Sequence, residues 1–279
     1  MSDGSASVPV SVIVLTKDEE VNIRPCLESL AWADEVIVVD SGSRDRTTTL
    51  AAETRKDVRL FSHSFQDFGD QRNWALDNTQ PRNDWILFVD ADERITTACA
   101  QAIRKAIAAP GATVGFYLCN RYIFLGRWIR HCTLYPSWQL RLLKKGQVRF
   151  RKEGHGQREV TDGPLAYIRE PYDHHGLSKG VSEWIARHNV YSSQEVELLL
   201  RLRREPIEWA KVFGPDPVDR RRSLKRLAAR MPCRALFRFL YMYVVRGGFL
   251  DGKPGLVFCR LRMSHEIHIV VKLREAERA

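Results

Sequence analysis

The chain has 279 residues, of which 44% are hydrophobic and 28% charged, as is usual for a protein that folds around one good core. Its six cysteines form no C-x-x-C pair and no metal-binding spacing, which favours reduced thiols in a cytosolic compartment. The opening MSDGSASVPV lacks a basic segment followed by an apolar one, and no stretch reaches the roughly 18 apolar residues of a membrane span. We therefore expect neither secretion nor a transmembrane segment.

The net charge of +10 is unevenly distributed. Residues 1–200 hold 25 Lys and Arg against 26 Asp and Glu, whereas residues 201–279 hold 19 against 8. The whole excess lies in the C-terminal region, which therefore needs its own explanation.

Strand and helix patterns alternate over roughly the first 110 residues. Apolar runs predict strands, and the segments between them carry helix signals such as acids in a first turn. The expected strands cover residues 8–15, 34–40, 58–61 and 85–89. The first expected helix ends at residue 30, and the others cover residues 44–54, 70–78 and 96–108. This alternation predicts a parallel α/β sheet.

The pattern changes between residues 115 and 172. Short aromatic and β-branched runs broken by glycine, such as GFYLCNRYIFLG, predict hairpins or added strands. Residues 180–202 are typical of one long helix, and prolines at 206, 215 and 217 then mark a break.

Acidic and polar residues follow three expected strands where they end, at Thr16 to Glu19, Asp40 to Asp45 and Asp90 to Glu93. If these strands are neighbours, the three loops form one crevice beyond their carboxyl ends, where α/β sheets bind ligands. An Asp-x-Asp pair on a turn suits Mg²⁺ or Mn²⁺ completed by substrate phosphates, which would compensate the clustered negative charge. The alternative is that these acids only cap turns and helices. The chain has no G-x-x-x-x-G-K-[ST] and no G-x-G-x-x-G, which argues against a P-loop kinase or an ordinary dinucleotide enzyme.

The segments SVIVLTKDEE, EVIVVDSGSRDRT, FGDQRNWAL and ILFVDADE, in this order and spacing, resemble the inverting family-two glycosyltransferases with a GT-A fold. Lipopolysaccharide-core β-glucosyltransferases and related bacterial polysaccharide transferases look most similar. The resemblance implies a mixed, mainly parallel sheet flanked by helices, a nucleotide-diphosphate sugar donor, expected to be UDP-linked, and a divalent metal. It implies a catalytic domain over residues 1–200, with 8–110 as the nucleotide-sugar half and 111–200 as the acceptor half.

The resemblance assigns the first two loops to the nucleotide. Thr16, Glu19 and Asp40 would contact the base and ribose, and Ser43 and Asp45 would shape the loop. The alternative for Asp40 and Asp45 is a turn or cap role, which is common for Asp after a strand.

The resemblance also supplies a phosphate and metal set. Arg72 and Asn73 would face the phosphates, and Asp90 and Asp92 would hold the metal, with Asp92 the more direct ligand and Asp90 also facing the donor. His174, beside His175 in PYDHHGLSKG, would complete the metal site. The alternatives are a solvated helix position for Arg72 and an ordinary loop histidine for His174.

Inversion by direct displacement needs a base near the acceptor hydroxyl. The segment RKEGHGQREV offers Glu153, His155 and Glu159, although it departs from the His-Glu dipeptide common in related transferases. We favour Glu159, which begins an apolar run, and then His155, whose flanking glycines suggest a close-approach loop. The alternative is that Glu159 is an exposed strand residue paired with a neighbouring arginine. Arg141, in SWQLRLL, is interpreted either as a diphosphate contact or as structural.

The basic C-terminal region predicts two amphipathic helices over residues 219–246, the second starting at Pro232. Arginines recur at every fourth position from 222 to 238, beside an apolar face. This pattern indicates contact with an anionic membrane surface, and hence a cytoplasmic enzyme on the inner face of the membrane with a glycan or lipid-linked acceptor. The alternative is that the apolar stripe packs on the catalytic domain.

Two other classes of protein fit parts of the pattern. A sugar nucleotidyltransferase also uses metal and nucleotide, but the first loop is not glycine-rich and basic. A nucleic-acid-binding or scaffold protein would use the tail arginines but leaves the acids at three strand ends unexplained. We therefore expect no nucleic-acid partner.

Overall fold

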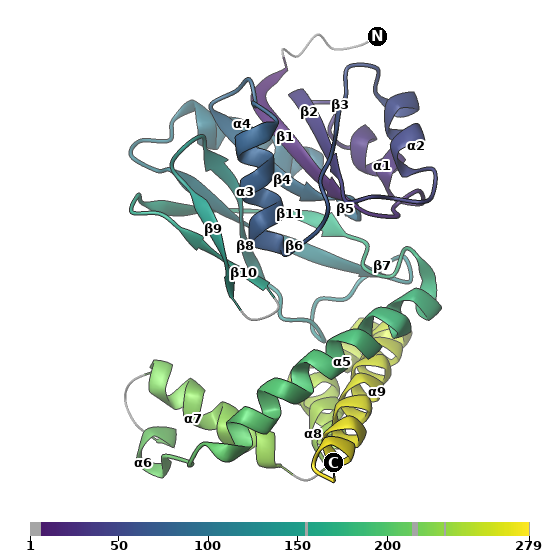
Figure 1. The fold of residues 1–279 in the computed structure, drawn as a ribbon, viewed down its shortest axis with the longest axis vertical. Coiled ribbons are helices and arrows are strands. Elements are labelled where there is room, and N and C mark those ends of the chain that lie inside the picture. The colour runs from purple at the N-terminus through teal and green to yellow at the C-terminus, as the bar shows by residue number, and fades with distance from the viewer. Residues whose placement is uncertain (1–6, 154–155, 214–216, 232, 279) are drawn as a thin grey trace. The chain divides into compact units, whose positions relative to one another are not determined.

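The computed structural model describes residues 7–153, 156–213, 217–231 and 233–278. The chain forms two compact units, which we call the sheet unit (residues 1–123 and 135–178) and the helical unit (residues 124–134 and 179–279). The predicted catalytic region, residues 1–200, contains the whole sheet unit and part of the helical unit. Figure 1 labels their elements.

The sheet unit contains a mixed sheet with the strand order β3-β2-β1-β4-β8-β6-β11-β5. The β2–β3, β1–β2, β1–β4 and β6–β11 pairs are parallel, and the β4–β8, β6–β8 and β5–β11 pairs are antiparallel. The strands are β1 (Val8–Thr16), β2 (Ala33–Asp40), β3 (Arg59–Ser62), β4 (Trp85–Asp90), β5 (Glu93–Arg94), β6 (Gly115–Phe124), β8 (Trp138–Lys144) and β11 (Leu165–His174). The predicted mixed, mainly parallel sheet is confirmed, and so are the added strands after residue 115.

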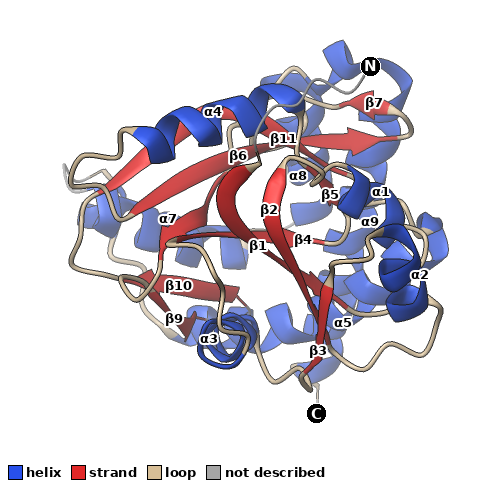
Figure 2. Ribbon diagram, turned by 90° about the horizontal axis from the view of Figure 1, so that it is seen from above, coloured by secondary structure: helices blue, strands red, loops and turns tan. Residues whose placement is uncertain are grey.

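Helices and a hairpin cover the two faces of this sheet. The helices are α1 (Ile23–Glu28), α2 (Thr47–Thr54), α3 (Phe68–Asn78) and α4 (Thr97–Ala108), and the hairpin is β9 (Arg149–Glu153) with β10 (Gly156–Val160). Alternate residues of β1 point to opposite faces: Val12 packs in a core with α1, α2 and α4, and Ile13 in a second core with α3 and β9. Figure 2 shows α4 on one side of the sheet and α3 with the hairpin on the other.

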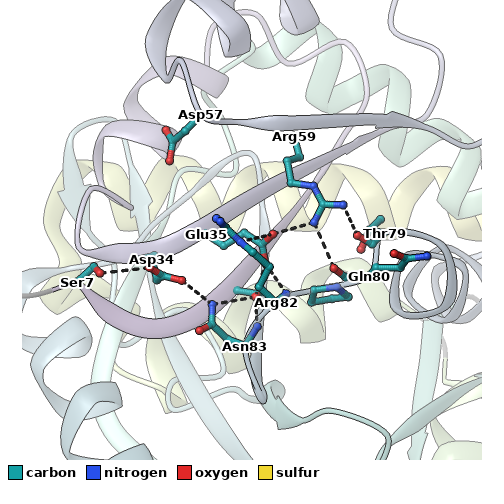
Figure 3. Close-up of polar contacts among 12 residues, drawn as sticks. Ser7, Asp34, Glu35, Asp57, Arg59, Thr79, Gln80, Arg82 and Asn83 are labelled. Atoms are coloured by element: carbon teal, nitrogen blue, oxygen red, sulfur yellow. Dashed lines mark hydrogen bonds and ion pairs between the residues drawn. The ribbon is translucent and has the colours of Figure 1, made fainter.

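A buried carboxylate ties together the amino-terminal halves of the central strands (Figure 3). Glu35 in β2 accepts hydrogen bonds from Ser11 Oγ at 2.5 Å, from the Arg82 backbone N–H at 2.8 Å and from the Arg59 guanidinium at 2.7 Å. Burial opposes ionisation of Glu35, but these hydrogen bonds outweigh it and hold its pKa below the ordinary value. This network fixes the sheet at the end opposite the strand-end acids.

The helical unit is built from long helices joined by short turns. Its elements are β7 (Arg127–Trp128), α5 (Gly180–Arg204), α6 (Trp209–Val212), α7 (Pro217–Arg230), α8 (Arg234–Leu240), the π-helix η1 (Tyr241–Val245), the 3₁₀-helix η2 (Gly248–Asp251) and α9 (Gly252–Ala276). The predicted helix over 180–202 is confirmed as α5. The predicted amphipathic pair corresponds to α7 and α8, but the expected start at Pro232 lies outside the described residues.

A buried aspartate attaches residues 124–134 to this unit. Asp251 accepts backbone hydrogen bonds from Arg130, His131 and Cys132 at 2.9–3.1 Å, and His131 Nδ1 lies 2.8 Å from its carboxylate. Within the described ranges, no helix combines the length and the apolar character needed to cross a membrane.

Candidate functional site

The register of the parallel strands brings the three strand-end loops to one edge of the sheet. Thr16 at the end of β1 pairs with Asp40 at the end of β2, and Leu15 pairs with Asp90 at the end of β4. The crevice expected from the sequence therefore has its three walls side by side.

Hydrogen bonds between backbone N–H groups and side-chain oxygens join the first two of these loops. The Asp18 N–H donates to Ser43 Oγ at 2.8 Å, the Arg44 N–H donates to Asp18 Oδ1 at 2.7 Å, and the Glu19 N–H donates to Thr47 Oγ1 at 2.7 Å. Asp18 reaches this position with a φ of 52°, which is uncommon for a residue with a side chain. The two loops thus form one rigid wall.

The predicted nucleotide-loop acids organise this wall. The Asp40 carboxylate accepts the Gly42 and Ser43 N–H groups at 3.0 and 2.8 Å and also contacts the Ser43 hydroxyl. Asp45 accepts the Thr47 N–H at 2.9 Å, and Glu19 accepts the side-chain amide of Asn22 at 2.6 Å. The turn role that was the alternative for Asp40 and Asp45 is therefore present in the structure.

Arg141 in β8 sits at the centre of the acidic cluster. Its Nη2 donates to Asp90 Oδ2 at 2.7 Å and to Glu93 Oε1 at 2.5 Å, and its Nε lies 3.4 Å from Tyr172 Oη. Burial opposes ionisation of Asp90, but Arg141 and Arg72 outweigh it and hold its pKa well below the usual range. Glu93 is 1% exposed, and burial raises its pKa to about 7 against the opposing effect of Arg141. Much of the clustered charge is thus compensated by the protein itself.

Arg72 in α3 links Asp90 to the hairpin. Its Nη2 lies 3.6 Å from Asp90 Oδ1, and its Nη1 donates to Gln157 Oε1 at 2.8 Å. Burial lowers the pKa of Arg72 to about 10, although Asp90 acts in the opposite direction. Asn73 makes different contacts, because its side-chain amide exchanges two hydrogen bonds with the backbone of Phe150, at 2.7 and 3.0 Å. Asn73 thereby fastens β9 to α3.

Asp92 and His174, two of the predicted metal ligands, lie together. The short β5–β11 pairing places His174 opposite Glu93, and His174 Nε2 lies 3.3 Å from Asp92 Oδ2. Burial lowers the pKa of His174, but Asp92 outweighs it and raises the pKa to about 9. Among the residues that the structure describes, no three histidine, cysteine or carboxylate side chains gather closely enough to hold a metal ion. A cation here would need ligands from a substrate.

A cavity of about 400 Å³ opens next to Asp90. Asp90, Arg72 and Glu159 supply its charged side chains, and the remaining lining residues are Phe68, Tyr117, Trp138, Gln139, Leu140, Phe150 and Gln157. The Glu159 carboxylate accepts a hydrogen bond from Tyr117 Oη, and burial together with Glu159 raises the pKa of Tyr117. Polar groups set among aromatic rings are typical of pockets that bind sugars or other small molecules.

Four buried polar atoms around the site have no hydrogen-bond partner in the part of the chain that the structure describes. They are Thr16 Oγ1, Gln71 Oε1, Arg72 Nε and Arg141 Nη1. Because buried polar groups are nearly always paired in native proteins, these atoms indicate a place where a polar ligand supplies the missing partners.

Two of the three predicted base candidates lack a described side chain. His155 lies outside the described residues, and only the backbone of Glu153 is described, as the end of β9. The sequence also did not predict the contributions of Tyr117 and Gln157. Tyr117 lies within an alternating apolar strand, where an aromatic residue indicates core packing, and no motif surrounds Gln157.

The family model described as "Glycosyl transferase family 2" matches residues 11–176, nearly the span of the sheet unit. Among curated proteins, the lipopolysaccharide core biosynthesis glycosyltransferase LpsC of Rhizobium meliloti is 26% identical over 215 residues, which cover 75% of this chain and 78% of LpsC. An uncharacterized glycosyltransferase of Rickettsia bellii is 23% identical over 95% of this chain and 86% of its own length.

Among solved structures, the mannosyltransferase PcManGT of Pyrobaculum calidifontis, in complex with GDP-Man and Mn²⁺, aligns with a TM-score of 0.48 at 17% identity. The alignment covers 96% of this chain and 88% of PcManGT. The family match extends over more than half of the chain and contains all three strand-end loops of the site. The chain belongs to glycosyl transferase family 2, and it is a glycosyltransferase.

Proposed function

We propose that this glycosyltransferase moves a sugar, with inversion, from a UDP-linked donor to a glycan or lipid-linked acceptor in cell-surface polysaccharide or lipopolysaccharide synthesis. The observation that carries the proposal is the position of Asp90, which lies between the strand-end crevice and the 400 Å³ cavity that holds Glu159. The name of LpsC supports a role in lipopolysaccharide synthesis. The transfer reaction would take place at the cytoplasmic face of the membrane.

The donor diphosphate fits beside the two buried arginines. Among the described residues, Arg72 Nε and Arg141 Nη1 each carry an N–H group without an acceptor. Thr16 Oγ1 and Gln71 Oε1, which also lack a partner, border the same crevice. The nucleoside would lie against the wall formed by the first two loops, where Glu19, Asp40 and Ser43 position the backbone. Charge-assisted hydrogen bonds from arginine to phosphate are among the strongest polar contacts in proteins.

Asp92 and His174 are the residues that fit a divalent metal. Asp90 is engaged by Arg141 and Arg72, so we assign it to positioning the donor. Mg²⁺ or Mn²⁺ would be held by Asp92, His174 and the diphosphate oxygens. Such an ion, when bound, acts as a Lewis acid that stabilises the departing diphosphate.

Glu159 is the residue we assign as the base. It shares the cavity with Asp90, and the Tyr117 hydroxyl holds its carboxylate in one orientation. An acceptor sugar stacked on Trp138 in this cavity would place its hydroxyl near Glu159. Glu159 would take the proton of that hydroxyl as the oxygen attacks the anomeric carbon from the side opposite the diphosphate.

Calorimetric titration with UDP tests the donor half of the proposal. We expect wild-type protein to bind UDP more tightly with Mn²⁺ than with EDTA, and Asp92→Asn to lose this metal dependence. Asp84→Asn, at the other end of β4, is the matched control and should bind as wild type does. If Mn²⁺ leaves the affinity of wild type for UDP, GDP and dTDP unchanged, the assigned metal site is wrong. If none of them binds, the assigned donor site is wrong.

Turnover tests the catalytic half. With UDP-sugars screened against lipid-linked acceptors, we expect Glu159→Gln to lower kcat by about 10²-fold or more while UDP affinity stays unchanged. Glu170→Gln, an exposed carboxylate in β11, is the control. Normal turnover by Glu159→Gln would show that Glu159 is not the base.

A further inference from the structure

The helical unit exposes an apolar strip along α8, η1 and η2. The strip, which we call the apolar ridge, consists of residues between 236 and 250 that are 42–73% exposed: Leu236, Phe237, Leu240, Tyr241, Val244, Val245, Phe249 and Leu250. Eight large side chains exposed to this degree leave on the order of 500 Å² of apolar surface in water, as large as the largest patch on a typical soluble monomer. A surface of this size indicates a binding partner.

The spacing of the six ridge residues in α8 and η1 places them on one face, and Phe249 and Leu250 belong to η2. Leu236, Leu240 and Val244 are separated by four positions each, and the next residue along is apolar at every one of these positions. Side chains four apart lie on the same side of a helix, so α8 and η1 present one two-residue-wide row to solvent. The opposite side contains Met242, which is buried at 5% exposure.

The charged residues close to the ridge in the sequence are nearly all basic. Between residues 233 and 262 the sequence has six Lys and Arg but a single acid, Asp251. That acid is buried and accepts the backbone N–H groups of residues 130–132, so it offers no negative charge to a partner. Lys253 and Arg260 are exposed. Exposed apolar side chains with basic neighbours in the sequence complement an anionic lipid surface.

Three arginines of the stripe that the sequence suggested as membrane-facing, Arg226, Arg230 and Arg234, are used inside the unit. Arg226 pairs with Glu205 at 2.8 Å and Glu208 at 2.6 Å, Arg230 donates to main-chain carbonyls of α5 and the residue after it, and Arg234 pairs with Glu266 at 3.1 Å. These arginines hold the helices together. The apolar side chains of the ridge, in contrast, are exposed.

We propose that the apolar ridge, residues 236–250, is the surface by which this enzyme binds an anionic lipid bilayer, with the ridge at the headgroup–acyl boundary. The ridge would bring the enzyme to the membrane that holds a lipid-linked acceptor, so this proposal rests on the proposed function. Phe237, Tyr241 and Phe249 supply the aromatic side chains that favour this boundary. Each basic residue near the surface raises binding to anionic lipid roughly fivefold, and salt weakens this attraction.

Sedimentation of the full-length protein with lipid vesicles tests the proposal. We expect wild type to bind phosphatidylcholine–phosphatidylglycerol vesicles, and phosphatidylcholine vesicles more weakly. Val245→Glu should reduce binding by about tenfold or more, since it puts a charge at the most exposed ridge position. Val190→Glu, in α5, adds the same charge at a valine that is 56% exposed and should keep nearly full binding.

A second pair of variants, with serine in place of valine, tests the ridge without adding a charge that could cause misfolding. Val244→Ser, 55% exposed, should weaken binding several-fold, whereas Val190→Ser, 56% exposed, should not. The circular dichroism spectrum and UDP affinity of each variant should equal those of wild type.

Three results would overturn the proposal: no vesicle binding by wild type, equal losses at positions 190 and 245, or self-association of wild type abolished by Val245→Glu without vesicle binding. The last would make the ridge a contact between two copies of the chain. Vesicle binding without nucleotide binding would instead reject the proposed function and leave the lipid surface standing.

Discussion

Replacing Arg141 by methionine tests how the acidic cluster is held together. The substitution keeps a long side chain but removes the cation that lies 2.7 Å from Asp90 and 2.5 Å from Glu93. Glu93 is 1% exposed, and among the described residues its other oxygen accepts a single hydrogen bond, from the Asp90 N–H at 2.9 Å. Asp90 keeps Arg72, and its side chain is 39% exposed. Most of the loss in unfolding free energy therefore comes from Glu93, which is left as a buried carboxyl group without its cation.

Breaking a buried ion pair by removing one partner costs about 3–5 kcal/mol, a large part of the roughly 5–15 kcal/mol that stabilises a typical domain. In urea, with a slope of about 1–3 kcal/mol per molar, this predicts a midpoint lower by at least about 1 M. Unfolding of wild type and Arg141→Met is followed by tryptophan fluorescence, because Trp85 and Trp138 lie at the ends of β4 and β8.

A double-mutant cycle decides whether unpaired charge is the cause. Adding Glu93→Gln to Arg141→Met removes the stranded carboxyl group and should recover about 2 kcal/mol or more, although Glu93→Gln alone is destabilising. The reasoning is refuted if Arg141→Met costs less than about 1 kcal/mol. It is also refuted if the two losses simply add, because Arg141 would then act through packing on Tyr172 alone.

Three other substitutions test separate parts of the sheet unit. Glu35 has a lowered pKa in the folded state, so its stabilising effect is present above about pH 4.5 and is lost as pH falls. Glu35→Gln should therefore make the free energy of unfolding decline less steeply on acidification. Urea titrations at neutral pH and at pH values below about 4.5 measure this decline. Tyr117→Phe should lower kcat about tenfold through Glu159 while leaving UDP affinity unchanged, and an unchanged kcat would contradict the positioning role. Asn73→Ala should cost about 1–3 kcal/mol in thermal unfolding, since two hydrogen bonds to Phe150 are lost, with normal UDP binding; weaker UDP binding at full stability would restore Asn73 to the donor site.

The nucleotide-side half of the sheet is predictable because its signals are local. The strands 33–40 and 85–90 each contain a run of apolar residues ended by an acid, and parallel strands carry their ends to the same edge. The last helix, α9, has no such signal, because its apolar residues are spread around the helix instead of forming one stripe. Its existence depends on packing against α5 and α8.

The acceptor side of the site is less predictable because its contacts join distant segments. Tyr117 and Glu159 are 42 positions apart, and Arg72 and Gln157 are 85 apart. Their meeting depends on how the β9–β10 hairpin packs against α3, which no short motif encodes. The role of Arg141 was open for the same reason, since it follows from the antiparallel pairing of β8 with β4.

The two aspartates of the Asp-x-Asp pair differ in their surroundings, which bears on how the proposed donor site would work. Asp90 faces two buried arginines, whereas Asp92 faces a histidine brought beside it by the β5–β11 pairing. A diphosphate that bonds to Arg72 and Arg141 would compete with Asp90 for the same cations, so a further positive charge in the crevice would favour its binding. A divalent ion at Asp92 and His174 would supply that charge and would couple donor binding to the metal.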